Sequence, residues 1–500
     1  MKKIILIAIL PITIMMAGSF VMTEGNPLIK ADTVSTSPTK PSSPTDTTSS
    51  DWTPKPLPTQ KFNVLDYGLT GNGVTDDSSA LRTLAKNTNV TNWYFPAGKT
   101  FRLKAITVPE HIKAVFGGGT LKTITDSESY PKGPINQTTD HTGYVIDGLT
   151  FVDDGGGSGY NGTYGFVSIS EHGRKENIEI RNCTFDGSSS ISTQFSRNAM
   201  TVRGNPDFGY TRNTWIHNNL FVNINGAGME ILQRGTIDPE GELKSNYNTR
   251  VNSNIFNGRG WCAISVSQAR SKTTIENNTF DNWKWDIELN QSKNITVQYN
   301  KSTNNREEFI SIGGAGWHTP EYDDNQAPNI NWVHHNHFDT DTSVIVMYSG
   351  TSTHVYANYI RGGFFISNRG GHGNTGNMYN NTIVKDSDIS TKIGTAGFIL
   401  GMTVHSGGGT FANDSVPFYD NDVYFTGTKT RYALNLYSSS GPKVSITGNT
   451  IRRGNTTDCI PSQSSSTISD NTCAKNYIGS IPTSRPGAGL SDPRNIGPQR

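Results

Sequence analysis

The sequence is poor in charge, apolar side chains and cysteine. Charged residues make up 17% of its 500 positions and the formal net charge is +1, so no basic excess is present for binding nucleic acid through bulk charge. Hydrophobic residues reach only 33%, and 4 cysteines are too few for a fold that depends on disulfides. Cys459 and Cys473 are close enough in sequence to close one small loop, whereas we expect Cys183 and Cys262 to be buried.

Two other residue types are abundant. The chain has 52 glycines and 48 asparagines. The asparagine amide competes with helical hydrogen bonds, and it favours turns and stacked amide ladders. A mainly helical protein is therefore excluded.

The two ends of the chain differ from its middle. Two lysines precede an apolar run from Ile4 to Ala17, which is typical of a secretory signal and too short for a stable spanning helix. We therefore expect residues 1–31 to be a signal peptide and the protein to be secreted, with an uncleaved N-terminal anchor as the alternative. Residues 32–60 are rich in Ser, Thr and Pro and predict a flexible linker, and residues 481–500 predict a flexible tail.

A motif Asn-x-apolar recurs through the middle of the chain. Its asparagine slot is occupied by Asn219, Asn254, Asn278, Asn300, Asn336, Asn358, Asn381, Asn449 and Asn471, and the segment around Asn182 is a slightly shifted copy. Many successive steps are 22 to 24 residues long, and the longer steps indicate insertions. Each repeat also has a second β-forming run with alternating side chains, such as AISVS at 263–267 and DIELN at 286–290.

A repeat of this length, made of short strands without a helix, predicts a parallel β-helix. Its coils stack about 4.8 Å apart, so the same slot of every coil forms a column. An inward asparagine column can satisfy its amides from coil to coil, and the apolar residue two positions later fills the interior. We therefore predict one all-β domain over residues 61–480.

The start of this domain resembles a known family. The segments FNVLDYGLTGNGVTDDSSALRTL (62–84) and YFPAGKTFRL (94–103) are similar to the N-terminal signature of the pectate-lyase-like superfamily. The resemblance implies a right-handed parallel β-helix with a short capping helix that starts near Asp76 and Asp77. It also implies carbohydrate chemistry, because the superfamily includes polysaccharide lyases, glycoside hydrolases, uronan epimerases and tailspikes, besides some non-catalytic members.

Outward polar residues concentrate in the coils between residues 219 and 320. Lys284 and Arg306 each follow a column asparagine by six residues, so we expect them in adjacent coils. One outward column is expected, if a one-residue slip is allowed, to hold Glu230, Ser265, Glu288 and Ser311. Nearby side chains suited to binding sugar rings or hydroxyls are Gln233, Trp261, Trp285, Asn290, Trp317 and His318.

These side chains fit β-elimination of a uronate polymer. Arg306 would neutralise the sugar carboxylate, and Lys284 would act as base or acid with Tyr247 as its proton-transfer partner. The resemblance to β-helical lyases supports such roles and favours alginate over a pectate-like substrate. Several of those lyases use calcium, which Glu230 and Glu288 could hold. We thus expect a secreted polysaccharide lyase, monomeric, whose partner is an acidic polysaccharide.

Alternatives remain open at this point. A glycoside hydrolase needs two carboxylates that flank the scissile bond, and candidates are Asp281, Asp286, Glu288 and Glu308. An epimerase shares the proton abstraction, but the sequence lacks the Asp-Pro-His-Glu signature associated with secreted alginate epimerases. A non-catalytic carbohydrate-binding surface protein would use the same face without reaction. Lys284 and Arg306 could also be ordinary surface ion pairs, and the tryptophans could be edge packing.

Overall fold

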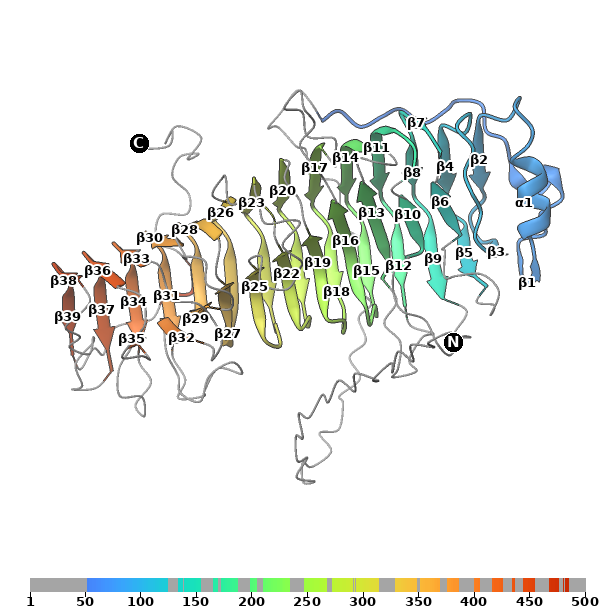
Figure 1. The fold of residues 1–500 in the computed structure, drawn as a ribbon. Coiled ribbons are helices and arrows are strands. Elements are labelled where there is room, and N and C mark those ends of the chain that lie inside the picture. Colours follow the sequence, from blue (N-terminus) through green and yellow to red (C-terminus); the bar gives the residue numbers. More distant parts are fainter. Residues whose placement is uncertain are drawn as a thin grey trace, which may run out of the picture. The chain divides into compact units, whose positions relative to one another are not determined.

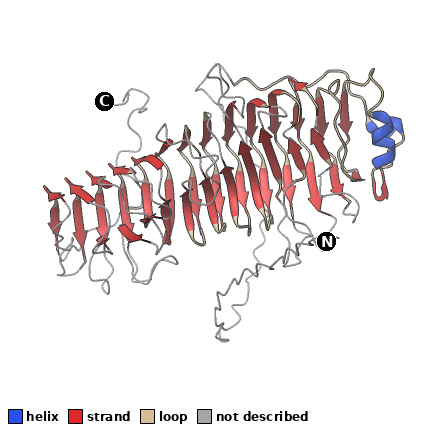
Figure 2. Ribbon diagram, in the orientation of Figure 1, coloured by secondary structure: helices blue, strands red, loops and turns tan. Residues whose placement is uncertain are grey.

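The computed structural model describes residues 52–484 except for 125–133, 138, 154–164, 170–171, 188–197, 205–209, 234–246, 268–271, 291, 293, 314–328, 349–350, 369–375, 386–399, 405–415, 426–433, 437–443, 455–466, 476–479 and 481. These residues form a right-handed parallel β-helix, as predicted (Figure 1). Strands follow one another round each coil and pair in parallel with the strands of the next coil. The described part of the chain holds one α-helix (Figure 2).

Each full coil has three strand positions, which we call faces 1, 2 and 3. Face 1 is a 15-stranded sheet, and faces 2 and 3 together form a 24-stranded sheet because β27 and β29 run through the corner between them. Face 1 contains β2 (Asn92–Phe95), β4 (Ala114–Gly117), β7 (His141–Thr142), β8 (Val145–Asp147), β11 (Lys175–Arg181), β14 (Thr211–His217), β17 (Tyr247–Asn252), β20 (Thr273–Glu276), β23 (Ile295–Gln298), β26 (Asn329–His334), β28 (Thr351–Tyr356), β30 (Asn377–Tyr379), β33 (Val416–Tyr419), β36 (Val444–Thr447) and β38 (Thr467–Ser469).

The strands of the larger sheet divide between the two remaining faces. Face 2 contains β1 (Asn72–Asp76), β3 (Thr100–Leu103), β5 (Thr120–Thr123), β9 (Thr150–Asp153), β12 (Thr184–Asp186), β15 (Leu220–Val222), β18 (Ile255–Asn257), β21 (Thr279–Asp281), β24 (Lys301–Thr303), the first halves of β27 (His337–Tyr348) and β29 (Tyr359–Asn368), β31 (Thr382–Lys385), β34 (Asp422–Phe425), β37 (Thr450–Arg453) and β39 (Thr472–Ala474). Face 3 contains β6 (Ile135–Gln137), β10 (Val167–Ile169), β13 (Met200–Gly204), β16 (Ala227–Gln233), β19 (Cys262–Ser267), β22 (Trp285–Asn290), β25 (Glu308–Gly313), the second halves of β27 and β29, β32 (Leu400–Val404) and β35 (Leu434–Leu436).

The predicted asparagine column forms the corner between faces 1 and 2. Asn278 is typical: its backbone N–H and its Nδ2 both donate to Oδ1 of Asn300 at 3.0 Å, and Nδ2 also donates to the carbonyl of Val251. The preceding residue, Asn277, has φ 54°, a left-handed conformation that asparagine tolerates better than most residues. Buried amides are thus satisfied from coil to coil, as a tight inward turn requires.

Apolar side chains fill the interior behind this column. A row of phenylalanines from successive face 2 strands stacks with ring centroids 4.5–5.2 Å apart, namely Phe151, Phe185, Phe221, Phe256 and Phe280. The spacing follows the distance between paired strands. Burial of these rings drives the coils together.

A short helix caps the N-terminal end, as predicted. The 3₁₀ helix η1 (Val64–Tyr67) precedes β1, and α1 (Ser78–Leu84) packs Leu81 and Leu84 into the end of the core. Asp77 is the N-cap residue, but its carboxylate accepts hydrogen bonds from the N–H groups of Thr70 and Gly71 in the preceding loop.

Residues 52–60, which we call the strap, fall within the predicted linker but lie against face 1 (blue in Figure 1). The backbone N–H of Lys55 donates to Oε2 of Glu179 at 2.8 Å. Leu57 packs on a small cluster of Ala114, Phe116 and Val145. A flexible linker over the whole of 32–60 is therefore not what the structure has, because the end of this segment has specific partners.

Among the described residues no helix is long and apolar enough to cross a membrane. Cys183 and Cys262 are buried free thiols, as predicted. Cys473 is disulfide-bonded, and its expected partner Cys459 lies outside the described residues.

Candidate functional site

The outward side of face 3 brings together the acidic residues singled out in the sequence. Glu230 on β16 pairs in register with Ser265 on β19, which pairs with Glu288 on β22 and then Ser311 on β25. The predicted column is therefore present, and it needs no slip in register. Alternation along each strand places the neighbours of these residues, such as Ile287 and Leu289, in the core.

The two glutamates of this column have different environments. Oε2 of Glu230 accepts from Nδ2 of Asn198 at 3.2 Å and forms an ion pair with Arg203 at 3.3 Å, which stabilises negative charge on it. Glu288 has a neutral partner, the hydroxyl of Ser265, 2.6 Å from its Oε2. Burial, together with the charge of Glu230, raises the pKa of Glu288 above its ordinary value against the effect of that hydrogen bond.

A third carboxyl group, that of Glu308, adjoins the column. Glu308 starts β25 beside Trp285, and only 4% of it is exposed. Burial raises its pKa to about 7. Its Oε2 is buried and has no hydrogen-bond partner among the described residues. The sequence named Glu308 as a candidate carboxylate, but its burial could not be inferred because it depends on how the corner before β25 packs.

Asp286, another candidate carboxylate, does not face the solvent. Its side chain is fully buried and accepts a hydrogen bond from the Ser302 hydroxyl inside the coil. The strand twists at its start, so that Asp286 and Ile287 are both buried. Asp286 is therefore excluded from an outward site.

The predicted basic pair lies at the corner between faces 2 and 3. Lys284 and Arg306 are in adjacent coils, as expected, because the Lys284 carbonyl accepts from the N–H of Glu307, the residue after Arg306. Nζ of Lys284 forms an ion pair with Glu307 at 3.3 Å. Nη2 of Arg306 donates to the carbonyls of Arg259 and Gly260 at 2.5 and 2.7 Å. Both cations thus have partners within the protein. Lys284 pairs with a carboxylate, whereas Arg306 binds main-chain carbonyls of the turn.

The two predicted sugar-binding tryptophans meet at the same corner. Trp261 and Trp285 are partly buried and contact edge to face, with ring centroids 5.8 Å apart. Nζ of Lys284 lies 5.3 Å from the centroid of the Trp285 ring. The neighbouring Trp283 points into the core instead and is fully buried. Two aromatic side chains therefore lie beside the carboxylate column, at the start of the strands that carry Ser265 and Glu288.

Tyr247 is not brought to this corner. It begins β17 on face 1, paired with Arg212, after the loop that follows face 3. The length of a face 3 strand separates the start of β17 from the corner that carries Lys284. Such a strand has six residues and spans about 20 Å at ~3.3 Å per residue. The predicted pairing of Lys284 with Tyr247 therefore has no support in the backbone geometry.

The remaining predicted residues lie at the far end of face 3 or outside the described residues. Asn290 ends β22 and pairs with Ser267, whereas Gln233 lies one position beyond Leu232, the partner of Ser267. Trp317 and His318 are outside the described residues.

The described residues do not fit a calcium site at Glu230 and Glu288. Calcium prefers six to eight oxygen ligands, and the described part of the chain offers no group of three or more His, Cys, Asp or Glu residues that could hold a metal. Oε2 of Glu230 is occupied by two nitrogen donors, one of them cationic. We derive no reaction step through calcium.

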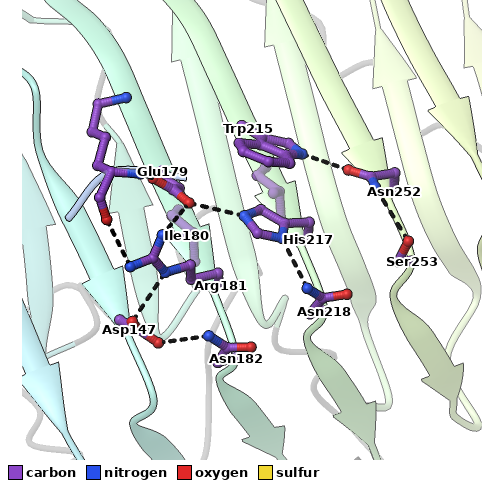
Figure 3. Close-up of polar contacts among 12 residues, drawn as sticks. Asp147, Glu179, Ile180, Arg181, Asn182, Trp215, His217, Asn218, Asn252 and Ser253 are labelled. Atoms are coloured by element: carbon purple, nitrogen blue, oxygen red, sulfur yellow. Dashed lines mark hydrogen bonds and ion pairs between the residues drawn. The ribbon is translucent and has the colours of Figure 1, made fainter. Parts of the chain in front are cut away.

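A second polar cluster, which the sequence did not reveal, lies on face 1 beneath the strap (Figure 3). Arg181 donates to Glu179 at 2.6 Å and to Asp147 at 2.9 Å, and Nε2 of His217 lies 3.0 Å from Glu179. Trp215 stacks on His217 with centroids 3.8 Å apart. Register pairing of β8, β11 and β14 creates this cluster, so only a correct three-dimensional alignment of coils could have identified it.

Comparisons with known proteins agree with the fold. No protein-family model matches the sequence, and no curated protein matches it. The N-terminal fragment of bacteriophage Phi29 gene product 12 is 15% identical over 83% of this chain and 71% of its own, with a TM-score of 0.54. An Azotobacter vinelandii mannuronan C-5 epimerase A-module (16% identity, 83% and 99% covered, TM-score 0.45) and a Thermotoga maritima exopolygalacturonase (11%, 79% and 88%, 0.42) are also similar.

At these identities the likeness concerns the fold alone, and membership of the pectate-lyase-like superfamily stays a prediction. The chain is a right-handed parallel β-helix protein.

Proposed function

We propose that the protein is a polysaccharide-active enzyme and that face 3 hydrolyses a glycosidic bond, with Glu288 as general acid and Glu230 as general base. The observation that supports this most strongly is the unequal pair of carboxyl groups on one outward column. Burial raises the pKa of Glu288, whereas Arg203 stabilises the charge of Glu230. Pairs of carboxyl groups in such different environments can divide the acid and base roles between them.

The spacing of the pair favours an inverting reaction. Glu230 and Glu288 are two strands apart, which puts about 10 Å between their Cα atoms at ~4.8 Å per strand. Carboxyl groups are about 6.5–9.5 Å apart in inverting hydrolases and about 5–5.5 Å apart in retaining enzymes. Side chains that leave the same face of strands about 10 Å apart are nearer to the wider separation. Glu288 would protonate the departing glycosidic oxygen while Glu230 removes a proton from the attacking water, and Trp261 and Trp285 would border the sugar chain.

Incubation with a panel of neutral and uronate polysaccharides tests the proposal. Hydrolysis predicts new reducing ends without the ultraviolet absorbance of an unsaturated product. Glu288→Gln and Glu230→Gln should each lower kcat by about 10²-fold or more, while Asp186→Asn on face 2 should leave activity unchanged. Since Glu288 acts in its protonated form, kcat should fall as pH rises through its raised pKa. Reducing ends that persist in both glutamine variants would rule out this pair.

A lyase that acts on alginate or a pectate-like polymer is the second candidate. Lys284 favours it, because its ammonium group lies near the Trp285 ring and forms an ion pair with Glu307. Lys284 immediately precedes the strand that carries Glu288. A lyase predicts ultraviolet absorbance together with reducing ends, and loss of both in Lys284→Ala. Repeating the assay with a chelator tests whether calcium takes part.

Secretion and a monomeric state belong to the same proposal. The lysine-led apolar run Ile4–Ala17 supports export. N-terminal sequencing of protein from the culture medium, together with light scattering, tests both points.

A further inference from the structure

The strap is anchored to face 1 at four points, at Trp52, Lys55, Leu57 and Gln60. The Trp52 ring lies 5.8 Å from that of Trp215 on β14, Leu57 packs on the cluster that spans β4 and β8, and the Gln60 carbonyl accepts from Nδ2 of Asn92 on β2 at 2.9 Å. The strap therefore crosses the strands of face 1 and does not add a strand to the sheet.

The central anchor uses the main chain of Lys55. Its N–H donates to Oε2 of Glu179 at 2.8 Å, and its carbonyl accepts from Nη2 of Arg181 at 2.9 Å. Glu179 is fully buried, and its carboxylate also forms hydrogen bonds with Arg181 and His217 (Figure 3). Arg181 in turn donates a hydrogen bond to Asp147. The carboxylate accepts from one peptide N–H and the guanidinium donates to one peptide carbonyl. Such a charged pair recognises an extended backbone whatever the side chain at that position.

Alternating prolines favour an extended backbone in the strap. Its sequence is WTPKPLPTQ, with Pro54, Pro56 and Pro58 between the residues that make the contacts. Proline fixes its own φ and pushes the preceding residue towards an extended conformation. The segment is thus largely extended before it docks, which lowers the entropy cost of binding.

We infer that face 1 between β2 and β14 is a docking surface for an extended, proline-alternating peptide, and that the chain fills this surface with its own residues 52–60. Aromatic side chains at one end, a buried charged pair in the middle and an apolar cluster at the other end define the recognised pattern as Trp-x-Pro-x-Pro-Leu. The covalently attached strap competes with any free peptide because its effective concentration is high. This inference is independent of the chemistry on face 3.

A labelled peptide of residues 50–62, added to the full chain, tests the inference. In the double variant Trp52→Ala with Leu57→Ala, the strap loses two anchors and the surface itself is unchanged. This variant should bind the peptide at least about tenfold more tightly than the wild type. Circular dichroism would establish that it remains folded, and failure of the folded variant to bind would overturn the inference.

Two altered peptides provide a matched control for the central anchor. Replacing Lys55 by Ala keeps the N–H that Glu179 accepts, so binding should change little. Replacing Lys55 by Pro removes that donor while keeping an extended chain, so binding should weaken by about tenfold or more. Equal binding of the two peptides would also overturn the inference, because recognition would then not depend on the buried pair.

Discussion

At the scale of single residues, one side chain type performs the same task in many coils. Within the column, Oδ1 of an asparagine accepts two hydrogen bonds from the previous asparagine, and the same residue donates two to Oδ1 of the next one. Asn254, Asn278 and Asn300 show this pattern. The amide side chain suits this role because its carbonyl oxygen can accept two hydrogen bonds while its NH₂ group offers two donors.

Replacing Asn278 by alanine should therefore be costly. The Asn254 N–H and the Val251 carbonyl would each lose a buried partner. We expect the free energy of unfolding to fall by about 2–4 kcal/mol, measured by denaturant titration. The matched control is Asn277→Gly at the preceding left-handed position (φ 54°), where glycine is well tolerated. An equal loss in both variants would contradict the role of the amide.

Asp286 makes stability depend on pH. Burial raises its pKa from 3.8 to about 8, so the folded state holds a proton that the unfolded state releases near pH 4. Stability should therefore decrease as pH rises from about 4 to about 8 and change no further above that range. Asp286→Asn should raise Tm by about 2–4 °C or more at pH 9 and leave it nearly unchanged at pH 4. A variant with the same pH profile as wild type would contradict this.

The sequence located part of the candidate site, for a physical reason. Glu230 and Glu288 were placed in one column because side-chain alternation and coil spacing suffice to align them. The pairing of Lys284 with Tyr247 has no support because Tyr247 begins a strand of face 1, and no spacing rule gives the face on which the chain resumes after an insertion. Arg306 was placed correctly beside Lys284, yet its bonds to turn carbonyls depend on three-dimensional packing.

At the scale of elements, β11 shows how a strand can combine core and surface tasks. Ile178 and Ile180 face the interior, while Glu179 and Arg181 hold the strap from outside. Burial alone would raise the pKa of Glu179, but hydrogen bonds from His217 and from the Lys55 N–H, with the charge of Arg181, lower it overall. The contribution of Glu179 to stability is thus present above the ordinary pKa and lost as pH falls through the lowered one.

Glu179→Gln should destabilise the protein by about 3 kcal/mol at neutral pH, because it leaves the buried Arg181 with one carboxylate partner fewer. The loss should shrink in acid, where the wild-type carboxyl group is also neutral. Glu176→Gln, on the same strand but bonded to the Tyr210 hydroxyl near the surface, should cost less than about 1 kcal/mol. Thermal unfolding at neutral and acid pH would check both, and equal losses in the two variants would count against the buried network.

At the scale of the whole molecule, each coil packs only on its two neighbours. The fold class, the coil length and the capping helix were predictable because they repeat or follow a local signature. The strap was not, because composition alone cannot distinguish a proline-rich linker from a proline-rich ligand. Its partners, Glu179 and Arg181, lie more than 120 residues away in sequence.

The C-terminal end of the stack should be the first to open. Thr472 and Cys473 of β39 are exposed, unlike the buried middle residue of β21. β39 pairs with β37 on one side, and the disulfide of Cys473 adds a covalent tie to this end. With Cys459 as the expected partner, the disulfide would close a loop of about 15 residues and contribute about 3 kcal/mol. Cys473→Ser should therefore speed amide hydrogen exchange in β37 to β39 and leave β21 and β22 unchanged, since coupling between coils is local. Faster exchange throughout the chain would contradict this.

The asparagine column also sets the unit in which such a protein can change its length. Removing residues 278–299 would bring Asn254 against Asn300 with the same bonds that it makes to Asn278, so one complete coil could leave without an unmatched amide. A deletion that is not a whole number of coils would break the series. The stack can therefore change length only in whole coils, and the number of coils sets the length of face 3.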